Sequence, residues 1–397
     1  MRSSEPSVWL LMLLAAVVAT TPLAIDMYLP AMPMMATELA TSIGLVQQSL
    51  SIFLAAYGIG MLLFGPLADM LGRRPLAVFG LTGFILASIA LSLASSIEWF
   101  LAWRAVQALA GAAASVVVPG IIRHLYQQHT AKGMSYVSMI MMLAPLVAPA
   151  MGSGIIWLAS WQAIFLFLAC YGMLVVGFCW RFLPEIRSDS DMQRPAFFSG
   201  YIKVFRHKAA WPDIASSMFA SFAFFCFLTA VSFVYIGYFG VSEQIFALLF
   251  GFNVLSLMSA NLLNSRLVVR FGPQRMLRFG LIVALGCAGL LSVFNFLGLG
   301  LWYTVFTVAP LMASLGLMAT NADAMIIMQF PDNSGTATAV IGTLRFGSGA
   351  LAGPLLAWFY TGDALPFSVL MLGGVLAIGV SQLWRQFGHQ GLSAARD

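Results

Sequence analysis

The chain is built from twelve apolar segments, each about 20 residues or longer, with short polar intervals between them. About 20 apolar residues in a helix cross the ~30 Å hydrocarbon core of a bilayer. Because lipid offers the backbone no hydrogen-bond partners, every crossing segment must be helical. The sequence therefore predicts an all-α membrane protein with twelve transmembrane helices. The expected segments are 8–35, 45–67, 76–93, 99–125, 133–158, 162–183, 209–239, 244–268, 276–296, 301–328, 336–360 and 364–384.

The longest charged interval of the chain, residues 184–208, lies between the sixth and seventh segments. It divides the sequence into two six-helix halves, 1–183 and 209–397, and we expect it to be a cytoplasmic linker. A faint repeat supports two pseudo-symmetric halves, since Gly72 and Gly272 follow the second and eighth segments in Arg-containing loops. Paired six-helix repeats are the design of large secondary transporters.

The basic residues predict the orientation of the chain in its membrane. Of the 19 Lys and Arg residues, all but Arg104 and Arg345 fall on the side of the N-terminus when placed on the twelve-segment map. By the positive-inside rule, both termini are then cytoplasmic in a multi-pass protein. This distribution explains the net charge of +5 better than nucleic-acid binding does, and no protein partner is evident.

No sequence pattern points to an enzyme, a cofactor or a metal. The chain lacks a Gly-x4-Gly-Lys phosphate loop, so we expect that ATP does not drive it. It also lacks HExxH and GxSxG motifs. The four cysteines lie in apolar segments without metal-binding spacing, at Cys170, Cys179, Cys226 and Cys287.

Asp26 is the only ionisable side chain of the first apolar segment. A charged residue within a membrane is unfavourable by roughly 2.5–3.5 kcal/mol on insertion scales, so it normally faces a polar cavity and has a partner. A carboxyl group can also become neutral there by taking up a proton. We therefore predict that Asp26 carries protons. The alternative is a structural Asp that caps a helix broken by Pro30 and Pro33.

A short polar motif follows the second segment, with Gly65, Asp69, Gly72, Arg73 and Arg74 at fixed spacing. Gly72 permits a tight turn, and the two arginines are expected to anchor the loop in the cytosol. Asp69 can pair with an arginine or lie at a helix N-terminus, where an anion is favoured. The motif predicts a conformational gate; the alternative is an ordinary cytoplasmic loop.

Several strings resemble known transporter motifs. The loop at 65–74 looks like the signature loop of the major facilitator superfamily. The string RAVQALAG at 104–111 resembles the proton-linked helix motif of that superfamily, and APLVAPAMG at 144–152 is similar to the motif of its drug–proton antiporters. IDMYLP at 25–30 and TLRFG at 343–347 resemble the bicyclomycin/chloramphenicol resistance (Bcr/CflA) branch.

The resemblance implies a transporter of the bacterial inner membrane with the major facilitator fold. It would export small amphipathic drugs, phenicol-like or bicyclomycin-like, in exchange for protons by alternating access about a midplane cavity. Its partners would be the drug, protons and the lipid bilayer. The alternative is a transporter of the same fold dedicated to one metabolite, such as a nucleoside or an amino acid.

Depth along the helices suggests that Asp26 and Arg104 act together in proton coupling. Asp26 lies ~15–18 Å from the outer end of its segment and Arg104 ~9–12 Å from the outer end of its own, at 1.5 Å per residue. Contact between them is feasible. Since arginine keeps its proton, its approach would favour the charged Asp26, and its withdrawal would favour the neutral form.

A second intramembrane ion pair is predicted between Asp323 and Arg345. Both lie ~12–15 Å from the turn that joins the tenth and eleventh segments, which should be neighbours. We favour a structural pair over direct coupling.

The remaining candidates are a hinge and a set of polar residues. Pro145, Pro149 and Gly152 interrupt the fifth segment and predict a bend or gate, with an ordinary helix kink as the alternative. Polar side chains within helices are candidates for the substrate cavity, each against the alternative of an interhelical hydrogen bond. They are Tyr28, Gln48, Tyr57, Gln107, Asn253, Asn261 and Asn321.

Overall fold

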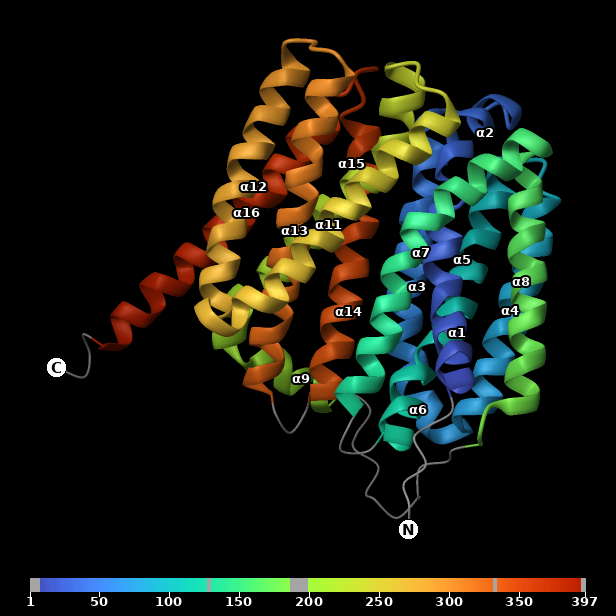
Figure 1. Cartoon of the computed structure of the whole chain (residues 1–397), viewed down its shortest axis with the longest axis horizontal. Coiled ribbons are helices and arrows are strands. Elements are labelled where there is room, and N and C mark those ends of the chain that lie inside the picture. The colour runs from blue at the N-terminus through green and yellow to red at the C-terminus, as the bar shows by residue number, and fades with distance from the viewer. Residues whose placement is uncertain (1–7, 127–129, 186–198, 331–333, 394–397) are drawn as a thin grey trace. The chain divides into compact units, whose positions relative to one another are not determined.

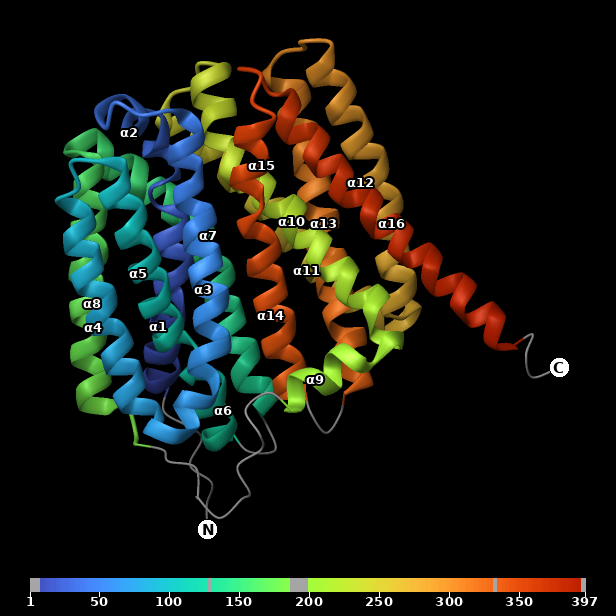
Figure 2. The same ribbon diagram turned by 180° about the vertical axis from the view of Figure 1, so that it is seen from behind.

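The computed structural model describes residues 8–126, 130–185, 199–330 and 334–393, and every regular element in these ranges is helical (Figures 1 and 2). The first six predicted segments form α1 Val8–Asp26, η1 Leu29–Ala31, α2 Met32–Glu38, α3 Ile43–Leu71, α4 Arg73–Ser92, α5 Ile97–Ser115, α6 Val117–Tyr126, α7 Thr130–Leu158 and α8 Trp161–Phe182. The rest of the chain forms α9 Ser199–Arg206, η3 Lys208–Ala210, α10 Trp211–Ser232, the π-helical η4 Phe233–Tyr238, α11 Glu243–Phe271, α12 Pro273–Phe296, α13 Leu301–Gln329, α14 Ser334–Ala350, α15 Ala352–Trp358 and α16 Leu365–Ser393.

The predicted all-α membrane fold is confirmed. Among the described residues, eleven helical stretches are long and apolar enough to cross a membrane, and α7 adds the apolar stretch Leu143–Leu158. Large apolar side chains point outward from these helices, as in Trp9, Phe279 and Trp358. A lipid-facing surface accounts for so much exposed apolar area, which a soluble monomer rarely shows.

Breaks within three predicted segments have a common cause. The helices α1, α5 and α14 end at Asp26, Ser115 and Ala350, and each of these residues stands four positions before a proline. Proline has no N–H to donate to the carbonyl four residues earlier, so the helical ladder ends there. Other prolines, among them Pro66 and Pro310, remain inside continuous helices.

Contacts between Cα atoms divide the chain into two compact units. Unit 1 comprises residues 1–193 and 242–251, and unit 2 comprises residues 194–241 and 252–397. In unit 1, α5 packs against α3 and α4, α8 against α4, and α1 against α7. In unit 2, α10 packs against α13, α14 and α16, while α12 packs against α13 and α16. The predicted division at 184–208 into two six-helix halves remains a prediction.

The two glycine turns of the predicted repeat have the same geometry. Gly72 joins α3 to α4 with φ +92°, and Gly272 joins α11 to α12 with φ +77°. Such angles strain residues that carry a Cβ atom, so both turns need glycine. Each glycine carbonyl accepts a long hydrogen bond, 3.3–3.4 Å, from the backbone N–H four residues later. The internal repeat therefore extends to the backbone of these turns.

Candidate functional site

Asp26 is the last residue of α1 and is 4% exposed. Within the described part of the chain, its carboxyl group makes no hydrogen bond and no ion pair. The C-terminal end of a helix gives a negative charge no stabilisation. The residues that begin η1 and α2 also receive no side-chain cap. The capping alternative for Asp26 therefore finds no support in its contacts.

Arg104 on α5 is fully buried and caps the end of α1. Its Nη1 donates to the carbonyl oxygen of Ala24 at 3.2 Å and to Oε1 of Gln107 at 2.6 Å. The last carbonyls of a helix lack intrahelical partners, and a cation is favoured at that end. The Arg104 side chain therefore satisfies a backbone group freed where α1 stops, two residues before Asp26.

Two aromatic rings hold the same guanidinium group. The Cζ atom of Arg104 lies 4.4 Å from the ring centroid of Tyr28 and 4.4 Å from that of Phe53. Cation–π contacts of this kind are worth about 2 kcal/mol or more when desolvated. The Nε and Nη2 atoms of Arg104 have no hydrogen-bond partner among the described residues. Arg104 therefore retains donors that its present contacts do not use.

The direct ion pair between Asp26 and Arg104 that the depth argument allowed is absent among the described contacts. Arg104 instead contacts the residues on either side of Asp26, the backbone of Ala24 and the ring of Tyr28. The helix end and the aromatic rings supply the stabilisation that the carboxylate was expected to give. A buried acid at the end of α1 and a buried cation on α5 thus lie near the same break without forming an ion pair.

Gln107 connects this cluster to the neighbouring helix. Its Nε2 donates to Oγ of Ser88 on α4 at 2.8 Å, and the Ser88 hydroxyl donates to the Phe84 carbonyl at 2.7 Å. Gln107 is fully buried, and its bond to Ser88 joins α5 to α4, which is the interhelical hydrogen bond that was the alternative to substrate contact.

Tyr28 is also fully buried, and its hydroxyl lies 3.0 Å from Oγ of Ser49 on α3. Its ring packs against Phe100 and Phe165, with centroids 6.5 and 6.1 Å away. The break after α1 is therefore fixed by aromatic packing as well as by Arg104.

A backbone contact between α7 and the break in α1 lies next to Asp26. A Cβ atom added to Gly152 would overlap the carbonyl oxygen of Met27. Gly154, two residues later on the same helix, has nothing within 4 Å of such an atom. Gly152 is therefore required for close approach, as its place in the predicted motif suggested. The helix α7 continues through Pro145 and Pro149, and the bend or gate expected at these residues remains a prediction.

The other cavity candidates differ in what they contact. Gln48 is half-buried, and Tyr57 lies beside Thr21 and Ser115 in the interior of unit 1. In unit 2, Asn253 is buried beside the Tyr235 hydroxyl.

Two further candidates in unit 2 make the interhelical bonds that were the alternative. The Asn261 side chain accepts from the hydroxyl of Thr320 at 3.2 Å. Nδ2 of Asn321 donates to Oδ1 of Asn264 at 3.0 Å. Both bonds join α11 to α13, which identifies a structural task for these residues.

The arginines of the loop motif bind the backbone of other helices. Arg73 donates to the carbonyl oxygen of Gly120 on α6, and Arg74 donates to that of Trp180 on α8. A Cβ atom at Gly120 would lie 2.6 Å from the Arg73 guanidinium carbon. The motif therefore ties the turn at Gly72 to two other helices. The Asp69 side chain lies outside the described structure, and Gly65 lies within α3.

The predicted pair in unit 2 is present in the structure. Arg345 Nη1 lies 2.9 Å from Oδ2 of Asp323, with the two side chains 40% and 22% exposed. Ser217 donates to Oδ1 of Asp323 at 2.5 Å, and Arg345 Nε donates to Oγ of Ser221 at 2.8 Å. The two serines stand one turn apart on α10, so this helix supports both partners.

A second ion pair in unit 2, which was not predicted from the sequence, joins α10 to α16. Asp213 is fully buried, and its Oδ1 lies 2.5 Å from Nη1 of Arg385 on α16. Gln329 on α13 donates to Oδ2 of Asp213 at 2.9 Å. Arg385 follows the last apolar segment and was expected to be a charge at the membrane surface, whereas its side chain contacts Asp213 in the interior of unit 2. The available signal was Asp213 itself, an acid within an apolar segment.

Known proteins resemble the chain in sequence and in fold. A family model described as the Major Facilitator Superfamily matches residues 13–354. The bicyclomycin resistance protein homolog of Haemophilus influenzae is 31% identical over 363 residues, which are 90% of this chain and 91% of that protein. The chloramphenicol resistance protein of Pseudomonas aeruginosa is 32% identical over 301 residues, covering 73% and 71%. A crystal structure of a nucleoside transporter matches with TM-score 0.74 at 12% identity, covering 95% and 99%, a likeness of fold alone.

We expect Gly152→Ala to lower the stability of the protein, because the new methyl group overlaps the Met27 carbonyl. Overpacking of this kind typically costs about 1–3 kcal/mol. Thermal unfolding of the purified protein in detergent measures the effect. Gly154→Ala is the matched control, since it makes the same helix-favouring change in open space. Equal stability of the two variants would contradict the close contact.

We expect Asp323→Asn and Arg345→Gln each to destabilise the protein by less than the ~3–5 kcal/mol of a fully buried pair, because Arg345 is partly exposed. The double variant should be milder than either single one, since neither charge is then left unpaired. Unfolding midpoints of all four proteins give the coupling energy. Additive losses would argue that the two residues act independently.

Proposed function

Because this chain belongs to the major facilitator superfamily, and within it to the bicyclomycin and chloramphenicol resistance family, we propose that it exports drugs in exchange for protons. The family and fold are those of membrane transporters and not of enzymes. Relatives named for resistance to bicyclomycin and chloramphenicol support small amphipathic antibiotics as the cargo. The bacterial inner membrane is the corresponding location, with both termini in the cytoplasm.

One observation carries the proton-coupled part of this proposal. Asp26 is buried in a membrane segment without a partner among the described residues, while Arg104 contacts the residues on both sides of it. A carboxyl group buried without a cation is much less unfavourable when it carries a proton. The burial of Asp26 therefore supports the proposal that it carries a proton in this arrangement.

Release of the proton follows from the unused donors of Arg104. Its Nε and Nη2 atoms have no partner among the described residues, and only Nη1 bonds to Ala24. When the break after α1 changes shape, Arg104 exchanges its contacts with Ala24 and Tyr28 for the carboxylate of Asp26. The charge pair then stabilises ionised Asp26, and the proton leaves on the side to which the site is open.

In this proposal the drug binds to the aromatic residues around Arg104. Its binding competes with the pairing of Arg104 and Asp26. Tyr28 and Phe53 lie on the guanidinium group, and Tyr57 stacks on Phe53 at 6.2 Å. Flat apolar surfaces beside a buried charge suit amphipathic molecules, and the 23 methionines of the chain add adaptable surface. Transport needs no cofactor in this scheme, since the proton gradient supplies the energy.

We expect Asp26→Asn to abolish drug resistance in a pump-deficient bacterial strain and to abolish drug-induced proton release from purified protein. The amide cannot carry the exchanged proton, although it is nearly the same size as the carboxyl group. Susceptibility assays and a pH-sensitive dye measure the two activities. Asp363→Asn is the matched control, because Asp363 caps the start of α16 through the Leu365 N–H, a bond that asparagine also accepts. Retention of both activities by Asp26→Asn would overturn the carrier role.

We expect efflux in vesicles to stop when the pH gradient is dissipated, and to include phenicol-like and bicyclomycin-like compounds in a radiolabelled panel. Efflux that continues without the gradient would contradict proton exchange. Selective transport of one nucleoside or amino acid would instead identify a dedicated metabolite transporter of the same fold.

A further inference from the structure

The short helix α9 lies at the end of unit 2 where α13 ends and α14 begins (Figures 1 and 2). Its Val204 side chain is fully buried in an apolar cluster with residues of α13 and α14, including Ile326 and Val340. The indole N–H of Trp211 donates to the carbonyl oxygen of Phe205 at 3.0 Å. These contacts hold α9 in a defined position against the helix bundle.

The outer face of α9 combines basic and apolar side chains. Lys203, Arg206 and His207 are exposed, and none of them forms an ion pair with any described residue. Ile202 and Phe205 are 50% and 40% exposed on the same short helix. A helix with exposed apolar residues between basic side chains is typical of elements that lie in the membrane interface.

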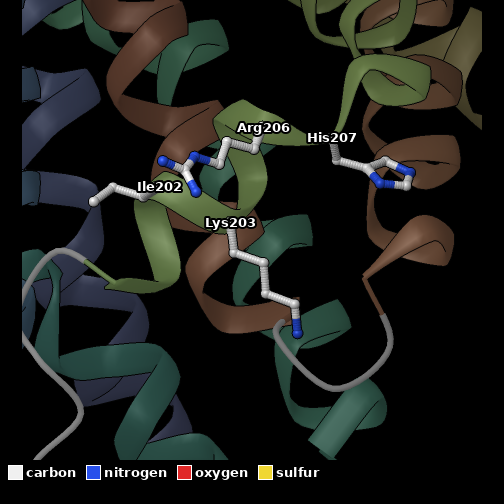
Figure 3. Close-up of a pocket in the computed structure, with 4 residues that line it drawn as sticks. All are labelled: Ile202, Lys203, Arg206 and His207. Carbon is white, nitrogen blue, oxygen red and sulfur yellow. The ribbon is translucent and has the colours of Figure 1, made fainter.

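An open hollow of about 380 Å³ lies on this face, lined by Ile202, Lys203, Arg206 and His207 (Figure 3). The His207 ring packs against Phe330 with centroids 5.2 Å apart, so one wall of the hollow is fixed to the end of α13. Figure 3 shows the Arg206 guanidinium beside Ile202, and Lys203 extending from the same turn of α9. Arginine binds phosphate oxygens through paired donors, and lysine adds a mobile charge.

The surroundings of the hollow indicate a lipid and not a soluble anion. The next membrane-crossing stretch begins at Lys208, directly after the lining residues. Trp211 stands at the start of α10, and tryptophan is enriched at membrane–water interfaces. The phosphate layer of the bilayer therefore lies at the depth of these cations, with acyl chains within reach of Ile202 and Phe205.

We propose that α9 binds the headgroup of an anionic phospholipid, with Arg206 and Lys203 on the phosphate and Ile202 against the glycerol and upper acyl chain. The proposed topology assigns this lipid to the cytoplasmic leaflet. Binding itself does not require that the protein transports any particular cargo.

Phosphatidylglycerol binding to the delipidated full-length protein in detergent, followed by native mass spectrometry, tests this site. Each surface cation contributes about 1 kcal/mol to attraction for anionic lipid, so Lys203→Gln with Arg206→Gln should weaken binding roughly 30-fold. Phosphatidylcholine binding should not change. Arg275→Gln with Arg278→Gln is the matched control, two exposed arginines on α12 that should leave phosphatidylglycerol binding unaltered.

Three results would overturn the proposal. They are an equal loss in the α12 control, no loss in the α9 variant, and displacement of the lipid by glycerol phosphate at comparable concentration, which would identify a soluble anion. Affinity of the unmodified protein must also fall as salt rises, since these cations are exposed. That measurement needs no variant. Because lipid binding is assayed without transport, its failure is separate from a failure of drug export.

Discussion

The capping of α1 by Arg104 is the interaction on which the site depends. Proline at position 30 ends the helix at Asp26 and leaves carbonyl groups without N–H partners inside a membrane segment. A bilayer core has no water to satisfy them, so the guanidinium of Arg104 does so at Ala24. The same arrangement brings a permanent cation close to an acid without joining them. A structural need of the backbone thereby places a cation near the carboxyl group that we propose as the proton carrier.

The transmembrane architecture was predictable because it follows from local properties of the chain. Apolar length decides which segments cross the membrane, and the positive φ of Gly72 and Gly272 follows from a turn that no other residue tolerates as well. The pair of Asp323 and Arg345 was predictable for a similar reason. Two opposite charges at equal depth on successive membrane helices are less unfavourable when paired than when each is alone.

The features that were missed depend on tertiary packing. Arg385 lies just beyond an apolar segment, and its position in the sequence alone does not show that its side chain pairs with Asp213. Helix α9 lies in an interval that is polar in sequence, and it is held there because Val204 packs into an apolar cluster with residues of α13 and α14. The breaks after Asp26 and Ser115 and the continuity of α7 through Pro145 and Pro149 show that a proline alone does not decide whether a helix is interrupted.

The contact of Gly152 with the Met27 peptide has a mechanical consequence. Contacts between side chains absorb small displacements by changing rotamers, whereas two main chains in touch have no such compliance. Sliding or tilting of α7 is therefore transmitted undamped to the peptide that follows Asp26. Because Gly152 has no side chain, its backbone contacts the Met27 peptide directly. A movement of α7 would therefore change the surroundings of the Asp26 carboxyl group.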